Sequence, residues 1–333
     1  MKKVLSLILA LAMVFALVAC GEKQPSNDGN TDGDKPPRGN VLMTFGTADT
    51  GGSMYPAGAA VSQVWTNNVE GVKCNTQTST GSFQNCQDVS TGEVDVAVAT
   101  SDVVLNAYNG TGKFADIGKL DNLRVIGAVY TSVLSGVALK SSGLTYIHDL
   151  LGKRVAVGPA ASATENATLA AFGVMGIDSS NTSLENLGLG DGADSVGDGI
   201  LDAAFGFAGL PIGGQLNLAA TKEIQVLDMT QEEIDKVLAG NAAYIQTKIP
   251  AGTYTGQDND ANTFGVKCLI IVTADMDADL VYDLCKAMNE HTEEMAAGNA
   301  LLKDMTDPSF LCTQMPIPLH DGAQKYYSEQ GLI

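Results

Sequence analysis

The sequence predicts an α/β protein with two lobes, each a mostly parallel sheet flanked by helices, and a ligand cleft between the lobes. From residue 41 onward, short apolar segments typical of strands alternate with segments whose apolar residues recur at helical spacing. This alternation begins again near residue 149. Apolar residues make up 45% of the 333 residues, which is enough to form a sizeable core.

The first α/β unit starts with an apolar strand, and Pro56 then suits the first turn of a helix. Ala57, Val61 and Val64 recur on one face of that helix. Further helices are expected after the loops at residues 79–82 and 100–102. Strands are expected at Val41–Gly46, Val72–Thr78, Val94–Thr100, Leu123–Tyr130 and Val133–Lys140.

The second unit repeats this order, with a helix after the loop at 159–164 and another at a capping box formed by Thr230 and Glu233. Its strands are expected at Arg154–Gly158, Asp202–Ala208, Glu223–Met229 and Phe264–Thr273, and closing helices at Leu280–Met288 and Gly322–Tyr327. We expect the chain to cross between lobes near Tyr130–Leu139 and Asn262–Val272. Lobe 1 then comprises residues 41–132 and 263–333, and lobe 2 comprises residues 133–262.

The N-terminus has the charged, apolar and small-residue pattern of a secretory signal. Lys2 and Lys3 precede the apolar run Val4–Val18, and Leu17-Val18-Ala19-Cys20 resembles the lipobox of bacterial lipoproteins. We therefore expect residues 1–20 to be a signal peptide, with Cys20 lipidated, and residues 21–40, rich in Pro, Gly, Asn and Asp, to be a flexible tether. The protein would then be extracytoplasmic and anchored to the cell membrane by lipid.

The charge balance argues against a nucleic-acid partner, because 38 acidic residues outnumber 19 basic ones and give a net charge of −19. With only three histidines and no CxxC, a metalloenzyme that relies on imidazole ligands is not expected. We assign no metal ligands and no cofactor, and whether a metal ion bridges the ligand and Asp102 stays open. Five cysteines follow Cys20, and an odd number excludes complete pairing. We interpret most of them as small core residues, and one disulfide of unpredicted pairing is compatible with the count.

Four loops share a composition of small and hydroxyl residues, and each follows an expected strand and precedes an expected helix. This position is the carboxyl edge of the sheet, where backbone N–H groups at helix starts favour anions. The alternative interpretation is ordinary helix capping by Ser and Thr. The loops are Thr50-Gly51-Gly52-Ser53, Thr80-Gly81-Ser82, Thr100-Ser101-Asp102 and Ala161-Ser162-Ala163-Thr164.

Three further features leave alternatives open. Asp102 suits either a substrate ammonium or cation, or the N-terminus of a helix. Tyr55 suits stacking on a ligand or packing within its loop. The segment Gly188–Gly199 lacks the acidic spacing of an EF-hand and is interpreted as a turn. Hydrolase, P-loop and zinc-protease motifs are absent from the sequence.

From about Val41 to Leu332 the chain resembles the solute-binding subunits of TRAP transporters, in particular the TAXI family. The matching segments occur in the same order along most of the chain. They are GTADTGGSMYPAGAA (46–60), TSTGSFQN (78–85), GEVDVAVATSDVVLNAYNGTGKF (92–114), LLGKRVAVGPAASAT (150–164), DGILDAAFGFAGLP (198–211), IPAGTYTGQDND (249–260) and IPLHDGAQKYY (317–327).

The resemblance implies a two-lobed fold like that of type II periplasmic binding proteins, acting as a monomer and not as an enzyme. It implies that the protein binds a small organic acid, either an amino acid such as glutamate or a mono- or dicarboxylate. It also implies delivery of that solute to TRAP permease subunits in the membrane. The substrate-binding residues it implies are Ser53, Tyr55, Gly81, Ser82, Asn85, Ser101, Asp102, Ser162, Thr164 and, on the facing wall, Gly209, Leu210 and Pro211.

Two departures from the family pattern affect the ligand. Ala161 and Ala163 stand where the family has glycines, and Thr80 replaces the glycine paired with Gly81. The added methyl groups narrow the space beside the backbone, so the ligand is not transferred from relatives. Two other functions stay open: a surface-anchored hydrolase with a Ser/His pair, and a solute sensor that signals to a kinase.

Overall fold

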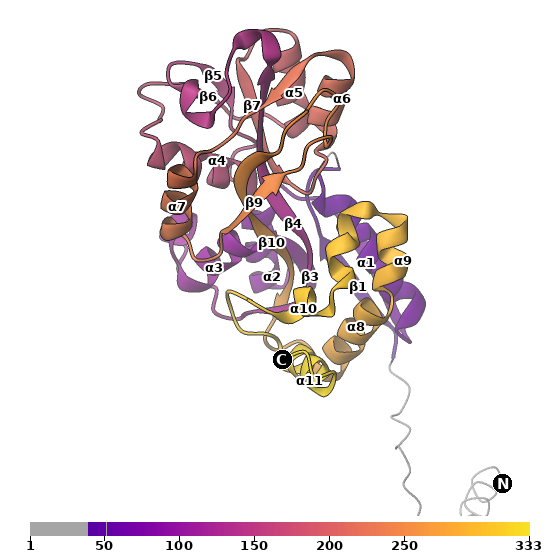
Figure 1. Cartoon of the computed structure of the whole chain (residues 1–333). Helices are drawn as coiled ribbons and strands as arrows, with labels where there is room; N and C mark the ends of the chain where they lie inside the picture. Colours follow the sequence, from indigo (N-terminus) through magenta and orange to yellow (C-terminus); the bar gives the residue numbers. More distant parts are fainter. Residues whose placement is uncertain (1–38, 51) are drawn as a thin grey trace, which may run out of the picture. The chain divides into compact units, whose positions relative to one another are not determined.

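Two long antiparallel strands, β4 (Leu123–Leu139) and β10 (Ala261–Thr273), lie at the centre of one mixed sheet (Figure 1). The structure is a computed structural model and describes residues 39–50 and 52–333. The pairing of β4 with β10 runs from Leu123 opposite Thr273 to Val133 opposite Gly265, with two register shifts. The ten strands follow the order β2-β1-β3-β10-β4-β7-β5-β6, and β8 and β9 pair with β4 and β10.

Lobe 1 is built on β1, β2 and β3, which are parallel to one another, while β10 runs antiparallel to β3. Its strands are β1 (Val41–Gly46), β2 (Val72–Gln77) and β3 (Val96–Thr100). Its helices are α1 (Met54–Asn68), α2 (Ser82–Thr91), α3 (Ser101–Asn109), α8 (Ala278–Glu290), α9 (Thr292–Gly298), α10 (Pro308–Cys312) and α11 (Asp321–Glu329), with short 3₁₀ turns η1 (Gly112–Phe114) and η4 (Ala300–Thr306).

Lobe 2 is built on β5, which lies parallel to β6 and β7, while β7 and β8 pair antiparallel with β4. Its strands are β5 (Arg154–Ala156), β6 (Ser183–Glu185), β7 (Ala203–Ala208), β8 (Ile224–Val226) and β9 (Ile245–Ile249). Its helices are α4 (Ala163–Val174), α5 (Leu189–Gly197), α6 (Gly213–Thr221) and α7 (Gln231–Gly240), with 3₁₀ turns η2 (Lys140–Ser142) and η3 (Ile147–Leu150).

The division into lobes is a proposal that we draw from this topology. The expected boundaries at 132/133 and 262/263 fall within β4 and within the first residues of β10, the two strands that run through both halves of the sheet. The described residues from 39 to 333 belong to one compact unit. The predicted signal peptide, Cys20 and the tether up to residue 38 lie outside the described residues. None of the helices in the described part is long and apolar enough to cross a membrane.

Several sequence expectations are corrected by the structure. The parallel pairings are present, but β4 and β10 make the sheet mixed. Leu123–Leu139 is one strand and not two. The predicted turn at Gly188–Gly199 is instead helix α5, in which Ala193 and Val196 are buried three residues apart. Burial of this apolar face outweighs the low helix propensity of its glycines and aspartates.

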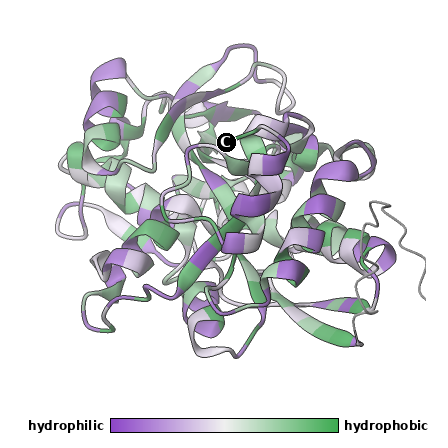
Figure 2. Ribbon diagram, turned by 90° about the horizontal axis from the view of Figure 1, so that it is seen from below, coloured by the Kyte–Doolittle hydropathy of each residue, from purple (hydrophilic) through white to green (hydrophobic). Residues whose placement is uncertain are grey.

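The core packs the helices against both faces of the sheet, and Figure 2 shows helices that carry both hydrophilic and hydrophobic segments. Trp65 of α1 is fully buried, and its Nε1 donates to the Leu284 carbonyl of α8 at 3.0 Å. The five cysteines of the described chain are buried and unpaired with one another, which confirms their interpretation as core residues. Burial raises the pKa of the Cys74 thiol to about 11, so it stays protonated at neutral pH.

Gly322→Ala is expected to destabilise the protein by about 1–3 kcal/mol through overpacking of α11 against α8. A Cβ at Gly322 would lie 2.1 Å from the Ala278 carbonyl oxygen. The matched control is Gly173→Ala in α4, where a Cβ meets nothing within 4 Å and should stabilise the helix slightly. Urea unfolding of the full chain measures both variants, and equal midpoints would contradict the tight packing of α11.

Candidate ligand-binding site

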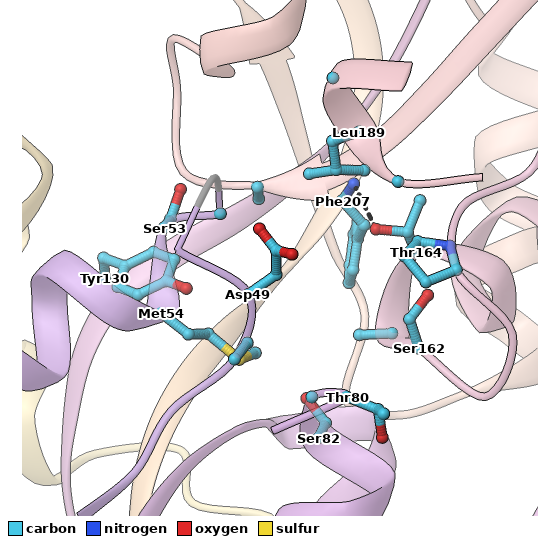
Figure 3. A pocket seen from close by; sticks show the side chains of 18 residues that line it. Asp49, Ser53, Met54, Thr80, Ser82, Tyr130, Ser162, Thr164, Leu189 and Phe207 are labelled. Atoms are coloured by element: carbon cyan, nitrogen blue, oxygen red, sulfur yellow. Dashed lines mark hydrogen bonds between the residues drawn. The ribbon is translucent and has the colours of Figure 1, made fainter. Parts of the chain in front are cut away.

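A cavity of about 120 Å³ lies between the two lobes and is lined from both of them (Figure 3). Lobe 1 contributes Ser53, Gly81 and Ser82, and lobe 2 contributes Ser162 and Thr164. These five are residues that the sequence places in the site. The loops between strand and helix therefore do meet at one place, although they come from distant parts of the chain.

Four helices begin at this cavity, because the N-cap residues of α1, α2, α4 and α5 all line it. These residues are Ser53, Gly81, Ser162 and Gly188. Gly81 has φ of +111°, a conformation that only glycine adopts without strain. Among the described residues, only α4 of the four has a side-chain cap, in which Ser162 Oγ accepts from the Glu165 N–H at 3.1 Å. The positive ends of four helix dipoles thus converge on a small volume.

Three hydroxyl groups in the wall are held as hydrogen-bond donors. Ser82 Oγ accepts from the Thr100 N–H at 3.1 Å, and Thr164 Oγ1 accepts from the Phe207 N–H at 3.1 Å. Ser162 Oγ is oriented in the same way by its cap. Since each oxygen accepts from the backbone, its own proton is left to be donated. The arrangement suits an acceptor group such as a carboxylate.

Apart from the hydroxyl residues Ser53 and Thr80, the rest of the wall is apolar, with one charged side chain. Met54, Tyr130, Leu189 and Phe207 line the cavity, and Tyr130 is almost fully buried. Burial raises the pKa of the Tyr130 phenol well above its ordinary value, so the hydroxyl is neutral. Asp49, in the loop after β1, is the only charged residue among the described residues that line the cavity, and Figure 3 shows its carboxylate directed into the space.

Four of the predicted site residues have other surroundings and do not line this cavity in the described part of the chain. The Nδ2 of Asn85 donates to the carbonyl of Thr47 at 2.5 Å and to that of Val98 at 2.7 Å, which ties β1 to β3. Ser101 and Asp102 are buried at the start of α3, and Tyr55 is half-buried in α1.

The predicted facing wall, Gly209-Leu210-Pro211, follows β7 in lobe 2. The Ser53 hydroxyl of lobe 1 donates to the Gly209 carbonyl at 3.3 Å, so this segment touches the rim of the site without lining the cavity in the described chain. The Leu210–Pro211 peptide bond is cis. Ligand contact by any of the twelve residues stays a prediction.

The sequence did not single out Asp49, Tyr130 and Phe207. Asp49 lies within the loop that predicted Ser53, and only its proximity in sequence could have drawn attention to it. Tyr130 and Phe207 sit in apolar strands, where an aromatic residue normally indicates core. In the described chain, no group of three or more His, Cys, Asp or Glu is placed to hold a metal ion.

Comparison with solved structures shows the class of fold. The chain resembles PhnD1 from Prochlorococcus marinus in complex with methylphosphonate at 11% identity, with a TM-score of 0.53, covering 88% of this chain and 99% of that one. It also matches the alkanesulfonate-binding protein SsuA from Xanthomonas axonopodis pv. citri bound to MOPS at 14% identity, with a TM-score of 0.48, covering 87% and 84%. The fold is that of the type II periplasmic binding proteins. The chain belongs to the NMT1-like family, which matches residues 45–331.

Asn85→Ala is expected to lower the free energy of unfolding by about 1–3 kcal/mol, because it removes a buried donor from the carbonyl groups of both Thr47 and Val98. Asn68→Ala is the control, since the Asn68 amide bonds only to the Val64 carbonyl on the exposed end of α1, and an effect within about 0.5 kcal/mol is expected. Chemical denaturation monitored by circular dichroism checks the pair. A neutral Asn85→Ala would refute the structural role given to this amide.

Proposed function

We propose that this protein is an extracytoplasmic solute receptor that binds a small organic acid in the interlobe cavity and delivers it to a TRAP permease. One observation carries the proposal: the N-termini of α1 and α2 from lobe 1 and of α4 and α5 from lobe 2 meet at one cavity. A solute held by donors from both lobes stabilises the state in which the lobes are in contact. Binding then shifts the population toward that state.

The ligand is expected to carry an anionic group, even though the protein has a net charge of −19. Long-range attraction is therefore unfavourable, and affinity must come from local donors. Helix N-termini and the hydroxyl groups of Ser82, Ser162 and Thr164 supply such donors without a cationic side chain. Hydrogen bonds to a charged acceptor are about twice as strong as neutral ones.

The size of the cavity limits the solute to a small molecule. A volume of about 120 Å³ holds about four water molecules, at ~30 Å³ for each. That volume corresponds to a compact acid, such as a small amino acid or a short dicarboxylate. A disaccharide or a peptide would exceed it.

Asp49 favours an amino acid over a dicarboxylate within this class. Its carboxylate lines the same cavity as the helix N-termini, so the site presents donors for an anion and one negative side chain. The ammonium group of an amino acid pairs favourably with that carboxylate, whereas the second carboxylate of a diacid is repelled. The apolar walls formed by Met54, Leu189 and Phe207 would contact the solute's carbon chain.

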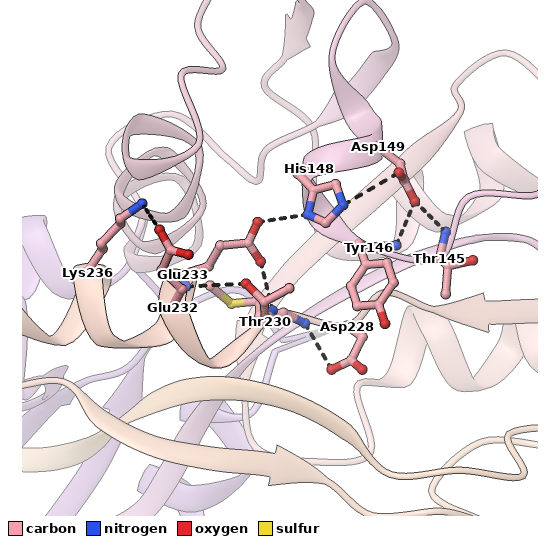
Figure 4. A network of polar contacts seen from close by, with 10 residues as sticks. Thr145, Tyr146, His148, Asp149, Asp228, Thr230, Glu232, Glu233 and Lys236 are labelled. Atoms are coloured by element: carbon pink, nitrogen blue, oxygen red, sulfur yellow. Dashed lines mark hydrogen bonds and ion pairs between the residues drawn. The ribbon is translucent and has the colours of Figure 1, made fainter.

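The hydrolase alternative finds no support at the cavity, because none of the three histidines lines it in the described chain. His148 lies on lobe 2 with its Nδ1 2.8 Å from Glu233 Oε1 (Figure 4). His320 Nδ1 accepts from the Gly322 N–H at the start of α11, and His291 pairs with Glu294. A sensor that signals to a kinase would bind its solute in the same way. Solute uptake that requires a TRAP permease would distinguish delivery from signalling.

A thermal-shift screen of the full chain tests the binding proposal against L-amino acids, mono- and dicarboxylates, methylphosphonate and sugars. A ligand of the native state raises stability by about 2.7 kcal/mol at a hundredfold excess over its Kd. We expect a compact amino acid to give the largest shift, and Thr164→Val and Ser82→Ala to weaken its binding at least about tenfold.

The matched control is Thr91→Val at the exposed end of α2, which is expected to bind like the wild-type protein. Turnover of an ester or amide by the wild-type chain would contradict the receptor. A larger shift with methylphosphonate than with any carboxylate would overturn the proposed ligand class while leaving solute binding intact.

Asp49→Asn distinguishes an amino acid from a diacid. With L-glutamate and glutarate, which differ by one amino group, the variant is expected to lose at least about tenfold in affinity for glutamate because the charged partner of the ammonium is lost. Affinity for glutarate is expected to rise or stay constant. Isothermal titration of both compounds measures the difference, and an equal loss for the two would show that Asp49 does not face an ammonium group.

A further inference from the structure

A buried carboxylate joins the lobes at a place outside the cavity. Asp102, in the first turn of α3 in lobe 1, is completely buried. Its Oδ2 accepts from Asn166 Nδ2 of α4 at 2.7 Å and from the Tyr244 hydroxyl at 3.3 Å, and both of these residues belong to lobe 2. Its Oδ1 is buried and makes no hydrogen bond of normal geometry among the described residues, although the Thr100 hydroxyl and the Val103 N–H lie close enough to favour the charged form. Burying a carboxylate with a well-formed hydrogen bond on only one of its oxygens costs free energy, so its presence here calls for a functional explanation.

The contacts of Asp102 depend on the lobes being in contact. If the lobes separate, Asn166 and Tyr244 move away from it and water reaches the carboxylate. In the present arrangement, loss of water raises the pKa of Asp102, and the Thr100, Asn166 and Tyr244 side chains lower it by less. The proton is therefore held more tightly when the lobes touch than when they are apart.

We propose that Asp102, Asn166 and Tyr244 form a proton-dependent latch between the lobes, so that lobe contact, and with it solute binding, becomes more favourable as the pH falls. The effect on solute binding rests on the proposed receptor function, while the effect on lobe contact does not. Asp102 acts here as a positioning residue, because it does not line the cavity in the described chain.

The latch acts on the same helix turn that forms one wall of the site. Asn166 lies in the first turns of α4, close after Ser162 and Thr164, which line the cavity. Glu165, which lies between Thr164 and Asn166 in the sequence, pairs with Lys113 of lobe 1 and accepts from the Ala161 N–H. The contact of Asp102 with Asn166 therefore fixes the N-terminus of α4 against lobe 1, in the position where its donors reach the solute.

Asp102 is the group of this cluster whose charge is expected to change. Tyr244 and the thiols of Cys86 and Cys268 each interact electrostatically with Asp102. Burial raises the pKa of all three groups, so they stay neutral near pH 7. The pKa of Glu165 is lowered by Lys113 and other donors despite the opposing effect of desolvation, so this group stays ionised.

The sign of the pH dependence follows from linkage. Above the raised pKa, Asp102 is ionised in both states and lobe contact must bury a charge. As the pH falls through that value toward about 4, the ordinary pKa of a solvated Asp, the state with the lobes in contact takes up a proton. Within this window, the equilibrium ratio of molecules with lobes in contact to molecules with lobes separated therefore rises up to tenfold for each pH unit that the pH falls.

Energy transfer between two dyes tests the latch without any solute. Cysteines replace the exposed Lys73 in lobe 1 and Lys222 in lobe 2 of the full chain carrying Cys20→Ser, while the buried native thiols stay unlabelled. The ratio of the population with lobes in contact to the separated population is expected to rise as the pH falls from 8 to 5, by up to tenfold for each pH unit below the raised pKa of Asp102. In Asp102→Asn, which mimics the protonated acid, this ratio is expected to be high and constant with pH.

Two further variants separate a latch from a general loss of structure. Tyr244→Phe removes a donor that stabilises the charged form, so the rise is expected to move to higher pH. Asp116→Asn, at an exposed carboxylate of lobe 1, is expected to keep the wild-type curve. A wild-type ratio that is constant with pH, or an Asp102→Asn variant that keeps the full rise, would overturn the latch. A pH-dependent ratio in a chain that binds no solute in the screen would support the latch and reject the receptor.

Discussion

The antiparallel pairing of β4 with β10 is the constraint on which the rest of the structure depends. Each strand enters both lobes, so β3 and β9 pair with β10 while β7 and β8 pair with β4. The lobes therefore share one sheet, and the register shifts between Cys268 and Leu269 and between Ile270 and Ile271 lie in the paired region. Relative movement of the lobes has to be absorbed in these two strands, since outside them only side-chain and loop contacts join the lobes.

Those contacts combine an apolar cluster that contains residues of both lobes, such as Phe114 and Phe172, with a few polar bonds. Ser53 bonds to Gly209 on one side, and Asp102 bonds to Asn166 on another. The Lys113–Glu165 pair joins an exposed lysine to a half-buried glutamate. It contributes little by itself, because ion pairs near the surface are worth about 0–1 kcal/mol. A solute held by donors from both lobes adds to these contacts and shifts the balance toward the state with the lobes in contact.

The sequence predicts those parts of the arrangement that depend on residues close together in the chain, and it does not predict those that depend on contacts between distant residues. Ser82 and Thr164 were found because the strand, the loop and the helix that place them are adjacent in the chain. The contact of Asp49 with the same cavity needs the lobes to be assembled, and no local pattern carries that information. The sequence alone left two roles open for Asp102, contact with a ligand and the start of a helix. Its hydrogen-bond partners lie 64 and 142 residues away, so no local pattern reveals them. Helix α5 was missed because burial of Val196, and not propensity, determines it.

The loop that leads into α4 shows how alanine at positions 161 and 163 bears on the site. Ala161 has φ of +60°, in the left-handed region that costs a non-glycine residue about 1–2 kcal/mol. Its N–H donates to Glu165 at 2.8 Å, and Glu165 pairs with Lys113 across the lobes, so the strained conformation is held by the same contacts that bring the lobes together. Ala163 places its methyl group in the cavity wall. Alanine at both positions leaves fewer backbone conformations open than glycine would, and a wall that is already ordered loses less entropy when a solute binds. Alanine at these two positions therefore gives a more rigid set of donors, and Ala163 also takes up room in the cavity wall.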